Sequence, residues 1–101
     1  MKRLANIHPG EILKEEFLDP LGLTAYRLAK ETNMPLTRIV DITNRKRRIT
    51  ADTALRLSKY FGNSAEFWLG LQIEYDLREE RESIEADLKK IHIFRKAVAH
   101  V

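Results

Sequence analysis

Closely spaced helix start and stop signals divide most of the chain into short segments, and they constrain the fold more than any other feature. Pro9 can open a first helix, because proline is tolerated where no intrahelical N–H bond is needed, and Pro20 followed by Gly22 ends it. Thr24 is a good N-cap for a second helix that runs to about residue 32. Asn33 then suits a tight corner, because asparagine tolerates the left-handed conformation.

Three further helices are predicted after that corner. Pro35 reopens the chain as a third helix that runs to about residue 44, and Thr50 caps a fourth that Gly62 ends. Ser64 caps a fifth helix, whose apolar side chains wrap more than one face and therefore need more than one neighbour. We expect an all-α, five-helix domain over residues 1–77.

The chain after residue 77 is heavily charged and forms a predicted extension over residues 78–101. Ile84, Leu88 and Ile91 keep helical i, i+4, i+7 spacing, which predicts that helix continues or restarts there. The β-branched and aromatic run at 91–94 leaves a short strand open as an alternative. We expect the extension to belong to the same domain or to a dimer interface.

The composition fits one folded domain and excludes several kinds of chemistry. The chain has 101 residues, of which 44% are hydrophobic and 33% charged, and it is too apolar to be disordered. Its lack of cysteine excludes disulfides, thiolate zinc sites, iron–sulfur clusters and cysteine nucleophiles. No apolar run is long enough for a membrane span or a signal peptide, so we expect a cytoplasmic protein without a membrane partner.

No catalytic or metal-binding set emerges from the residue spacing. The three histidines lie far apart, without the i, i+4 spacing typical of metal ligands on a helix. The pairs Glu15–Glu16 and Glu79–Glu80 are adjacent in sequence, so their side chains point to different sides of a helix and cannot work as an acid/base pair. We therefore expect no enzyme, no bound metal and no cofactor.

Positive charge is concentrated in the centre of the chain. Residues 23–63 hold nine Lys/Arg against three Asp/Glu, a net charge of +6, whereas residues 1–22, 64–70 and 71–101 each carry a net charge of −1. Focused basic charge is typical of proteins that bind a polyanion.

Two short helices joined at Asn33 and flanked by further helices form the pattern of a helix-turn-helix domain. The start of the second of them would face base edges in the major groove, where Arg38 could fork onto guanine and Asp41 could accept from cytosine. The cationic loop at 45–48 would bind phosphates of double-stranded DNA. The predicted DNA-binding residues are Thr24, Arg27, Leu36, Thr37, Arg38, Asp41, Arg45, Lys46, Arg47 and Arg48.

Plainer interpretations of the same residues stay open. A small helical bundle shows this periodicity without binding DNA, and a cationic loop is often only a solvated face. Arg27 could simply pair with a neighbouring carboxylate, and Asp41 could orient Arg38 or Arg45 across a turn.

The predicted fifth helix carries more apolar surface than one small core can cover, which predicts a homodimer. Two-fold symmetry would place the recognition helices about 34 Å apart, matching successive major grooves. The predicted interface residues are Trp68, Leu71, Ile73, Tyr75 and Leu77.

Two longer segments are more specific than the helix-turn-helix pattern. They are HPGEILKEEFLDPLGLT and RLAKETNMPLTRIVDITNRKRRITADTALRLSKYFGNSAEFWLGLQ, and within them HPGEIL and SAEFWLGLQ are the most specific parts. Through these segments the run from Ile7 to Gln72 resembles the HigA-type antitoxins, a branch of the phage-repressor-like (Xre) helix-turn-helix proteins. The chain departs from their pattern at Asn33 and Arg45, where glycine is more usual.

The resemblance implies a five-helix phage-repressor-like domain, although it says little about the chain after Glu74, and it implies three partners. These are operator DNA, a second copy of the chain and a small basic ribonuclease toxin, and the implied recognition helix is Leu36–Asp41. Charge makes two acidic segments candidates for contact with such a toxin: Glu79–Glu85 and the residues around Glu11, Glu15 and Glu16.

The first candidate function is therefore a DNA-binding autorepressor that also neutralises a toxin, and there are two alternatives to it. The second is a stand-alone repressor of the same fold without a toxin, which composition does not distinguish from the first. The third is a small basic ribonuclease, which would need several strands and a cluster of His, Lys, Arg and Glu that the helical pattern does not provide.

Overall fold

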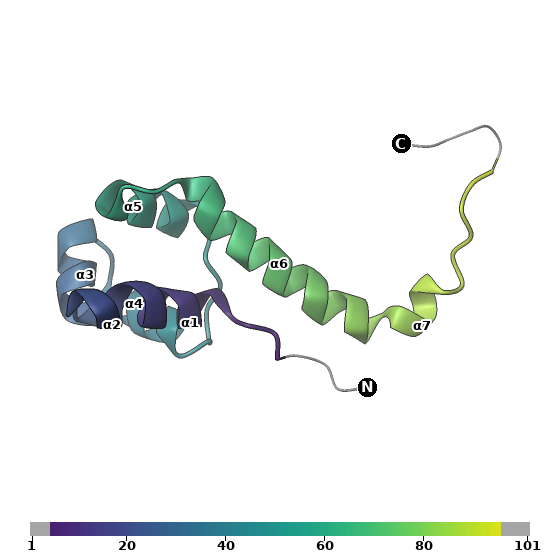
Figure 1. Cartoon of the computed structure of the whole chain (residues 1–101), viewed down its shortest axis with the longest axis horizontal. Coiled ribbons are helices and arrows are strands. Elements are labelled where there is room, and N and C mark those ends of the chain that lie inside the picture. Colours follow the sequence, from purple (N-terminus) through teal and green to yellow (C-terminus); the bar gives the residue numbers. More distant parts are fainter. Residues whose placement is uncertain (1–4, 96–101) are drawn as a thin grey trace.

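Helices make up all the regular secondary structure in residues 5–95, the part of the chain that this computed structural model describes (Figure 1). The all-α prediction is therefore confirmed, and all five predicted helices are present. The helices after the first are α3 (Ala25–Thr32), α4 (Leu36–Thr43), α5 (Ala51–Phe61), α6 (Ala65–Ser83) and α7 (Glu85–Leu88).

The first predicted helix is one continuous rod with an irregular middle. It consists of α1 (Pro9–Ile12), a π-helical turn η1 (Leu13–Leu18) and α2 (Asp19–Leu21). In the π-helical turn the Asp19 N–H donates to the carbonyl of Lys14, five residues back. This spacing buries Leu13 and Leu18 together, whereas Phe17 is only partly buried.

The helices from α1 to α5 and the first half of α6 surround one core. Its apolar side chains come from η1, α3, α4, α5 and α6 and from the loop residues Met34 and Ile49, and the fully buried ones in the helices are Leu13, Leu28, Ile39, Ile42, Ala54, Leu57 and Trp68. In Figure 1 the C-terminal half of α6 extends away from the packed helices as a long rod. The helix-turn-helix pair therefore lies in a well-packed body, while the end of α6 does not.

The charged extension begins inside α6, because this helix runs without a break through the predicted boundary at residue 77. The helix ends at Ile84 and restarts as α7, as the apolar spacing predicted. The alternative of a strand at 91–94 is wrong for the described residues, which form no strand. Ile91, Ile93 and Phe94 are 70–80% exposed there, with no neighbouring strand to pair with.

The described residues leave part of the extension out. Residues 96–101, including His100, lie outside them. Within residues 5–95, no helix has both the length and the apolarity needed to cross a membrane.

Candidate nucleic-acid interface

The helix α4 is bounded at both ends by a left-handed corner. At the first corner Asn33 has φ 56°, the Met34 N–H donates to the Ala29 carbonyl at 2.9 Å, and the Asn33 N–H donates to the Lys30 carbonyl at 3.4 Å. This pair of hydrogen bonds is a Schellman motif, which satisfies the last carbonyls of α3. The two helices therefore meet at Asn33, as predicted.

The second corner repeats the motif at the other end of α4. Arg45 has φ 62°, its N–H donates to the Ile42 carbonyl at 3.0 Å, and the Lys46 N–H donates to the Asp41 carbonyl at 2.7 Å. The positive φ explains why glycine is more usual at Asn33 and Arg45, since only glycine adopts it without a Cβ penalty.

The faces of α4 divide as the sequence predicts. Ile39 and Ile42 are fully buried against the core, while Thr37 is exposed and Leu36 is 42% exposed. Val40 is also exposed, at 36%, and it was not among the predicted contact residues. The first turn of α4 thus presents side chains that could reach base edges.

Arg38 is the least exposed of the predicted base-reading side chains, because it pairs with the next helix. Its Nη1 donates to Asp52 Oδ2 at 2.5 Å and to Thr53 Oγ1 at 3.4 Å. The hydrogen bond from Arg38, followed by one from Arg56, holds the pKa of the Asp52 carboxyl below its ordinary value. Asp52 therefore stays ionised at neutral pH.

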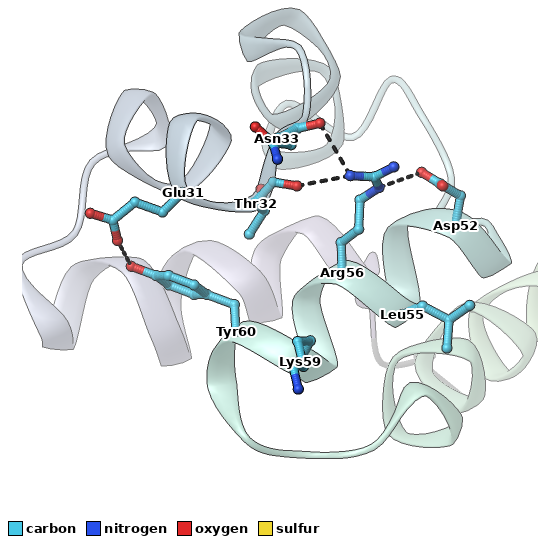
Figure 2. A pocket seen from close by; sticks show the side chains of 8 residues that line it. All are labelled: Glu31, Thr32, Asn33, Asp52, Leu55, Arg56, Lys59 and Tyr60. Atoms are coloured by element: carbon cyan, nitrogen blue, oxygen red, sulfur yellow. Dashed lines mark hydrogen bonds and ion pairs between the residues drawn. The ribbon is translucent and has the colours of Figure 1, made fainter.

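Arg56 connects this ion pair to the first corner. Its Nε donates to Asp52 at 3.1 Å, and its Nη1 donates to the Thr32 and Asn33 carbonyls at 3.0 and 3.2 Å. Figure 2 shows the guanidinium between the corner and Asp52, at one side of an open pocket of about 550 Å³ between α3 and α5.

Sequence reasoning missed the part that Asp52 and Arg56 play beside α4. The signal that could have drawn attention to the pair is its i, i+4 spacing, since a carboxylate and a guanidinium four residues apart on a helix lie next to each other.

The basic loop, residues 45–48, carries carboxylate partners for most of its cations. Arg45 pairs with Glu11 at 3.4 Å, Arg47 with Asp41 at 3.7 Å and Arg48 with Asp76 at 2.8 Å. Lys46 makes no ion pair within residues 5–95. All four loop residues are exposed, and exposed pairs of this kind contribute only about 0–1 kcal/mol each, so phosphates can compete for these cations.

The remaining predicted contacts lie at the start of α3. Thr24 is its N-cap, and its Oγ1 accepts from the Arg27 N–H at 3.0 Å. Arg27 donates to Glu31 at 3.0 Å, which is the plainer alternative stated for it. Asp41 likewise pairs across a turn, but with Arg47 and not with Arg38 or Arg45.

The HPGE segment, residues 8–11, packs against the second corner. His8 Nδ1 accepts from the Gly10 N–H at 2.9 Å, and Glu11 Oε2 accepts from the His8 N–H at 3.2 Å, which together form a capping box. Glu11 Oε2 also accepts from Arg45 Nη1. A Cβ at Gly10 would lie 1.7 Å from the Ile42 carbonyl oxygen, so only glycine permits this crossing of α1 and α4.

His8 is 4% exposed and its ring meets Tyr75 edge-on, with ring centroids 4.9 Å apart. Burial is the main cause that lowers the pKa of His8 below 6.5. The ring is therefore neutral at physiological pH, as Nδ1 must be to accept a hydrogen bond.

The predicted dimer residues separate into buried and exposed groups. The prediction for Trp68 is wrong, because its side chain is fully buried in the core of its own chain and its Nε1 donates to Asn63 at 2.9 Å. Leu71 packs against the core, and Tyr75 is partly covered by His8. Ile73 and Leu77 are 55% and 43% exposed on α6, so they remain available to a second chain.

Comparison with known proteins agrees with this geometry. The helix-turn-helix family pattern matches residues 13–68. Virulence-associated protein I of Dichelobacter nodosus is 52% identical over 81 residues, which are 77% of this chain and 75% of that protein. An addiction-module antidote protein of the HigA family from Coxiella burnetii superimposes with a TM-score of 0.84 at 42% identity, over 90% of this chain and 100% of that one.

A second solved structure holds nucleic acid. Antitoxin HigA of Pseudomonas aeruginosa, solved with the higBA promoter, gives a TM-score of 0.83 at 36% identity over 88% of this chain and 97% of that one. These similarities confirm the resemblance that HPGEIL and SAEFWLGLQ indicated, and they place the chain among DNA-binding regulators rather than enzymes. The chain belongs to the HigA-type branch of the Xre-like helix-turn-helix family.

Proposed function

We propose that this chain binds a specific operator in double-stranded DNA and represses the operon that encodes it. The observation that carries the proposal is the exposed first turn of α4, followed at the other end of the same helix by the exposed basic loop. The first turn would read base edges while the loop binds phosphates, and phosphate contacts fix the register of the protein on the duplex. The promoter-bound Pseudomonas aeruginosa HigA supports this assignment.

Salt dependence of binding tests the role of the loop. We expect the Arg47→Ala/Arg48→Ala variant to bind all duplexes more weakly and to lose about one unit of the log–log salt slope per lost phosphate contact. Fluorescence anisotropy with DNA from upstream of the gene, between about 50 and 200 mM salt, measures both quantities. An unchanged slope would show that the loop does not contact the DNA.

We also propose that the chain acts as a homodimer through the exposed part of α6. Ile73 and Leu77 lie one turn apart on this helix and leave apolar surface uncovered. Light scattering at micromolar concentration should give twice the chain mass, and Ile73→Lys/Leu77→Lys should give the single mass. The single substitution Glu74→Lys, at an exposed position of the same helix, adds the same two units of positive charge and serves as a control for altered surface charge.

The second activity we propose is neutralisation of a small basic ribonuclease toxin encoded next to this chain. The relatives named antitoxins support it, as does the net charge of −1 on each flanking segment. Glu15, Glu16, Glu79 and Glu80 are exposed carboxylates for such a partner, whereas Glu11 is already bonded to His8 and Arg45. A basic toxin would be repelled by the central basic segment, so it and DNA could bind together.

Co-expression tests the toxin proposal. Growth arrest by the neighbouring protein should be relieved by this chain, and still relieved when Arg47 and Arg48 are neutralised. If no neighbouring protein is toxic or co-purifies, the stand-alone repressor takes its place, a reading favoured by relatives that are described only as HTH-type transcriptional regulators.

A further inference from the structure

The guanidinium of Arg38 is held on one side only. Nη1 donates to Asp52 Oδ2 and to Thr53 Oγ1, and because Nη1 carries two hydrogens, these bonds occupy both. Nε and Nη2 form the other edge of the guanidinium, and no acceptor in residues 5–95 bonds to them. Arg38 therefore keeps one complete pair of parallel donors for an outside partner.

Asp52 is itself held in place by a second arginine. Arg56 Nε donates to the same Oδ2 at 3.1 Å, and Arg56 is bonded in turn to the two corner carbonyls. Figure 2 shows this order, with Arg56 between Asp52 and the corner at Thr32 and Asn33. A continuous line of polar contacts thus runs from the corner through α5 to the first turn of α4.

We propose that Asp52 is a positioning residue for base reading, which holds Arg38 so that its Nε–Nη2 edge meets a guanine. The inference rests on the proposed DNA-binding function. Guanine presents O6 and N7 on its major-groove edge, and two parallel N–H donors of arginine match them. An arginine fixed before binding loses less side-chain entropy at the interface than a free one.

The opposite role for Asp52 gives opposite results. A carboxylate that merely withheld Arg38 from DNA would weaken the operator complex, and its removal would strengthen binding at the guanine. A carboxylate that positions Arg38 improves discrimination at one base pair although its negative charge repels phosphates at every sequence. Discrimination and overall affinity therefore move in different directions only if Asp52 positions Arg38.

Selection of binding sites from a randomised duplex library tests this directly, because it needs no prior operator sequence. The full chain should prefer guanine at one position of each half-site, and Arg38→Ala should lose that preference. Asp52→Asn should lose it at the same position by roughly tenfold, while its affinity for scrambled duplex stays equal or rises. The double variant should lose no more than Arg38→Ala alone.

Matched variants separate this role from loss of charge or of fold. Asp19→Asn removes one exposed, lysine-paired carboxylate from α2 and should leave the guanine preference intact. Asp52→Ser keeps a small polar residue in the first turn of α5 and should repeat the loss seen with Asp52→Asn. Thermal melts confirm that each variant is folded.

Three results would overturn the inference. They are an undiminished guanine preference in both Asp52 variants, stronger binding with sharper preference, and a loss spread evenly over all positions. A wild-type chain that shows no sequence preference at all would instead overturn the proposed function itself.

Discussion

The two corners of α4 share one hydrogen-bond pattern but have different neighbours. The Asn33 corner is braced by a side chain, since Arg56 reaches over from α5 to its carbonyls. The Arg45 corner is braced by backbone, since α1 crosses it so closely at Gly10 that no side chain fits between them. The first corner thus depends on polar bonds that can be replaced, and the second on a steric fit that cannot.

The largest effect is expected from breaking the second corner. Gly10→Ala would place a Cβ at 1.7 Å from the Ile42 carbonyl oxygen, so α1 or α4 must move. We expect the free energy of unfolding to fall by about 3 kcal/mol and the Tm by roughly 15 °C. Thermal and urea unfolding followed by circular dichroism measure both.

Gly70→Ala is the matched control for that substitution. Gly70 is also helical, but nothing lies within 4 Å of a Cβ built there. Alanine should therefore stabilise α6 by about 0.5–1 kcal/mol through its better helix propensity. Two glycine-to-alanine changes with the same sign would contradict the steric account of Gly10.

The next effect tests the polar brace of the first corner. Arg56→Met keeps the aliphatic stem but removes both bonds to the corner carbonyls, and we expect a loss of about 1–2 kcal/mol. Lys59→Met, on the same helix and without an ion pair in the described residues, should change stability by less than about 0.5 kcal/mol. Equal melts for the two variants would show that Arg56 does not support the corner.

A change of pH should affect the second corner and not the first. Only the second corner is crossed by α1, and the N-cap of α1 is His8. The folded-state pKa of His8 lies below 6.5, so the unfolded chain binds the proton more readily and stability falls as pH drops below about 6.5. The loss should approach about 1 kcal/mol, the cost of one lost N-cap. The carboxyls of Asp52 and Glu31, whose pKa values are lowered, titrate only in more acidic solution.

His8→Asn isolates this pH effect, because asparagine caps a helix without titrating. The variant should lose the extra pH dependence between pH 7.5 and 5.5, whatever its stability at neutral pH. Urea midpoints at several pH values give the comparison. A wild-type curve parallel to that of the variant would remove His8 from the account.

The smallest effect compares the two left-handed residues themselves. Arg45→Gly removes the Cβ penalty of a positive φ, and we expect a gain of about 0.5 kcal/mol after the greater flexibility of unfolded glycine is subtracted. Asn33→Gly should gain less, since asparagine tolerates this conformation better. Arg45→Gly should also weaken DNA binding, which would show why arginine stands there.

Local signals predicted most of this architecture. Caps, prolines and apolar spacing identified the helices, and Asn33 marked the first corner correctly, whereas Arg45 stood out only as a departure from the family pattern and no corner was predicted there. The signals failed where the answer depends on how helices lie in space. The Arg38–Asp52 pair joins two helices, and Arg48 meets Asp76 across 28 residues of chain, distances that no periodicity encodes.

The error at Trp68 has the same origin. A helix that is apolar on several sides needs several neighbours, but the pattern does not say which side meets its own core and which meets a partner. In α6 the core takes Trp68, with Leu71 packed against it, and Ile73 and Leu77 are left exposed. Likewise, the π-helical turn at Leu13–Leu18 changes which residues share a face, and regular 3.6-residue spacing could not anticipate it.

Fixing both ends of α4 has a kinetic consequence for its encounter with DNA. Ordering a free backbone costs about 1–2 kcal/mol per residue, and in this fold that cost is met when the chain folds rather than when it docks. Docking then approaches a rigid-body encounter, in which altered contacts appear mainly as altered residence times. A substitution that released either corner would transfer part of the ordering to the encounter, and association would slow although no side chain facing the DNA had changed.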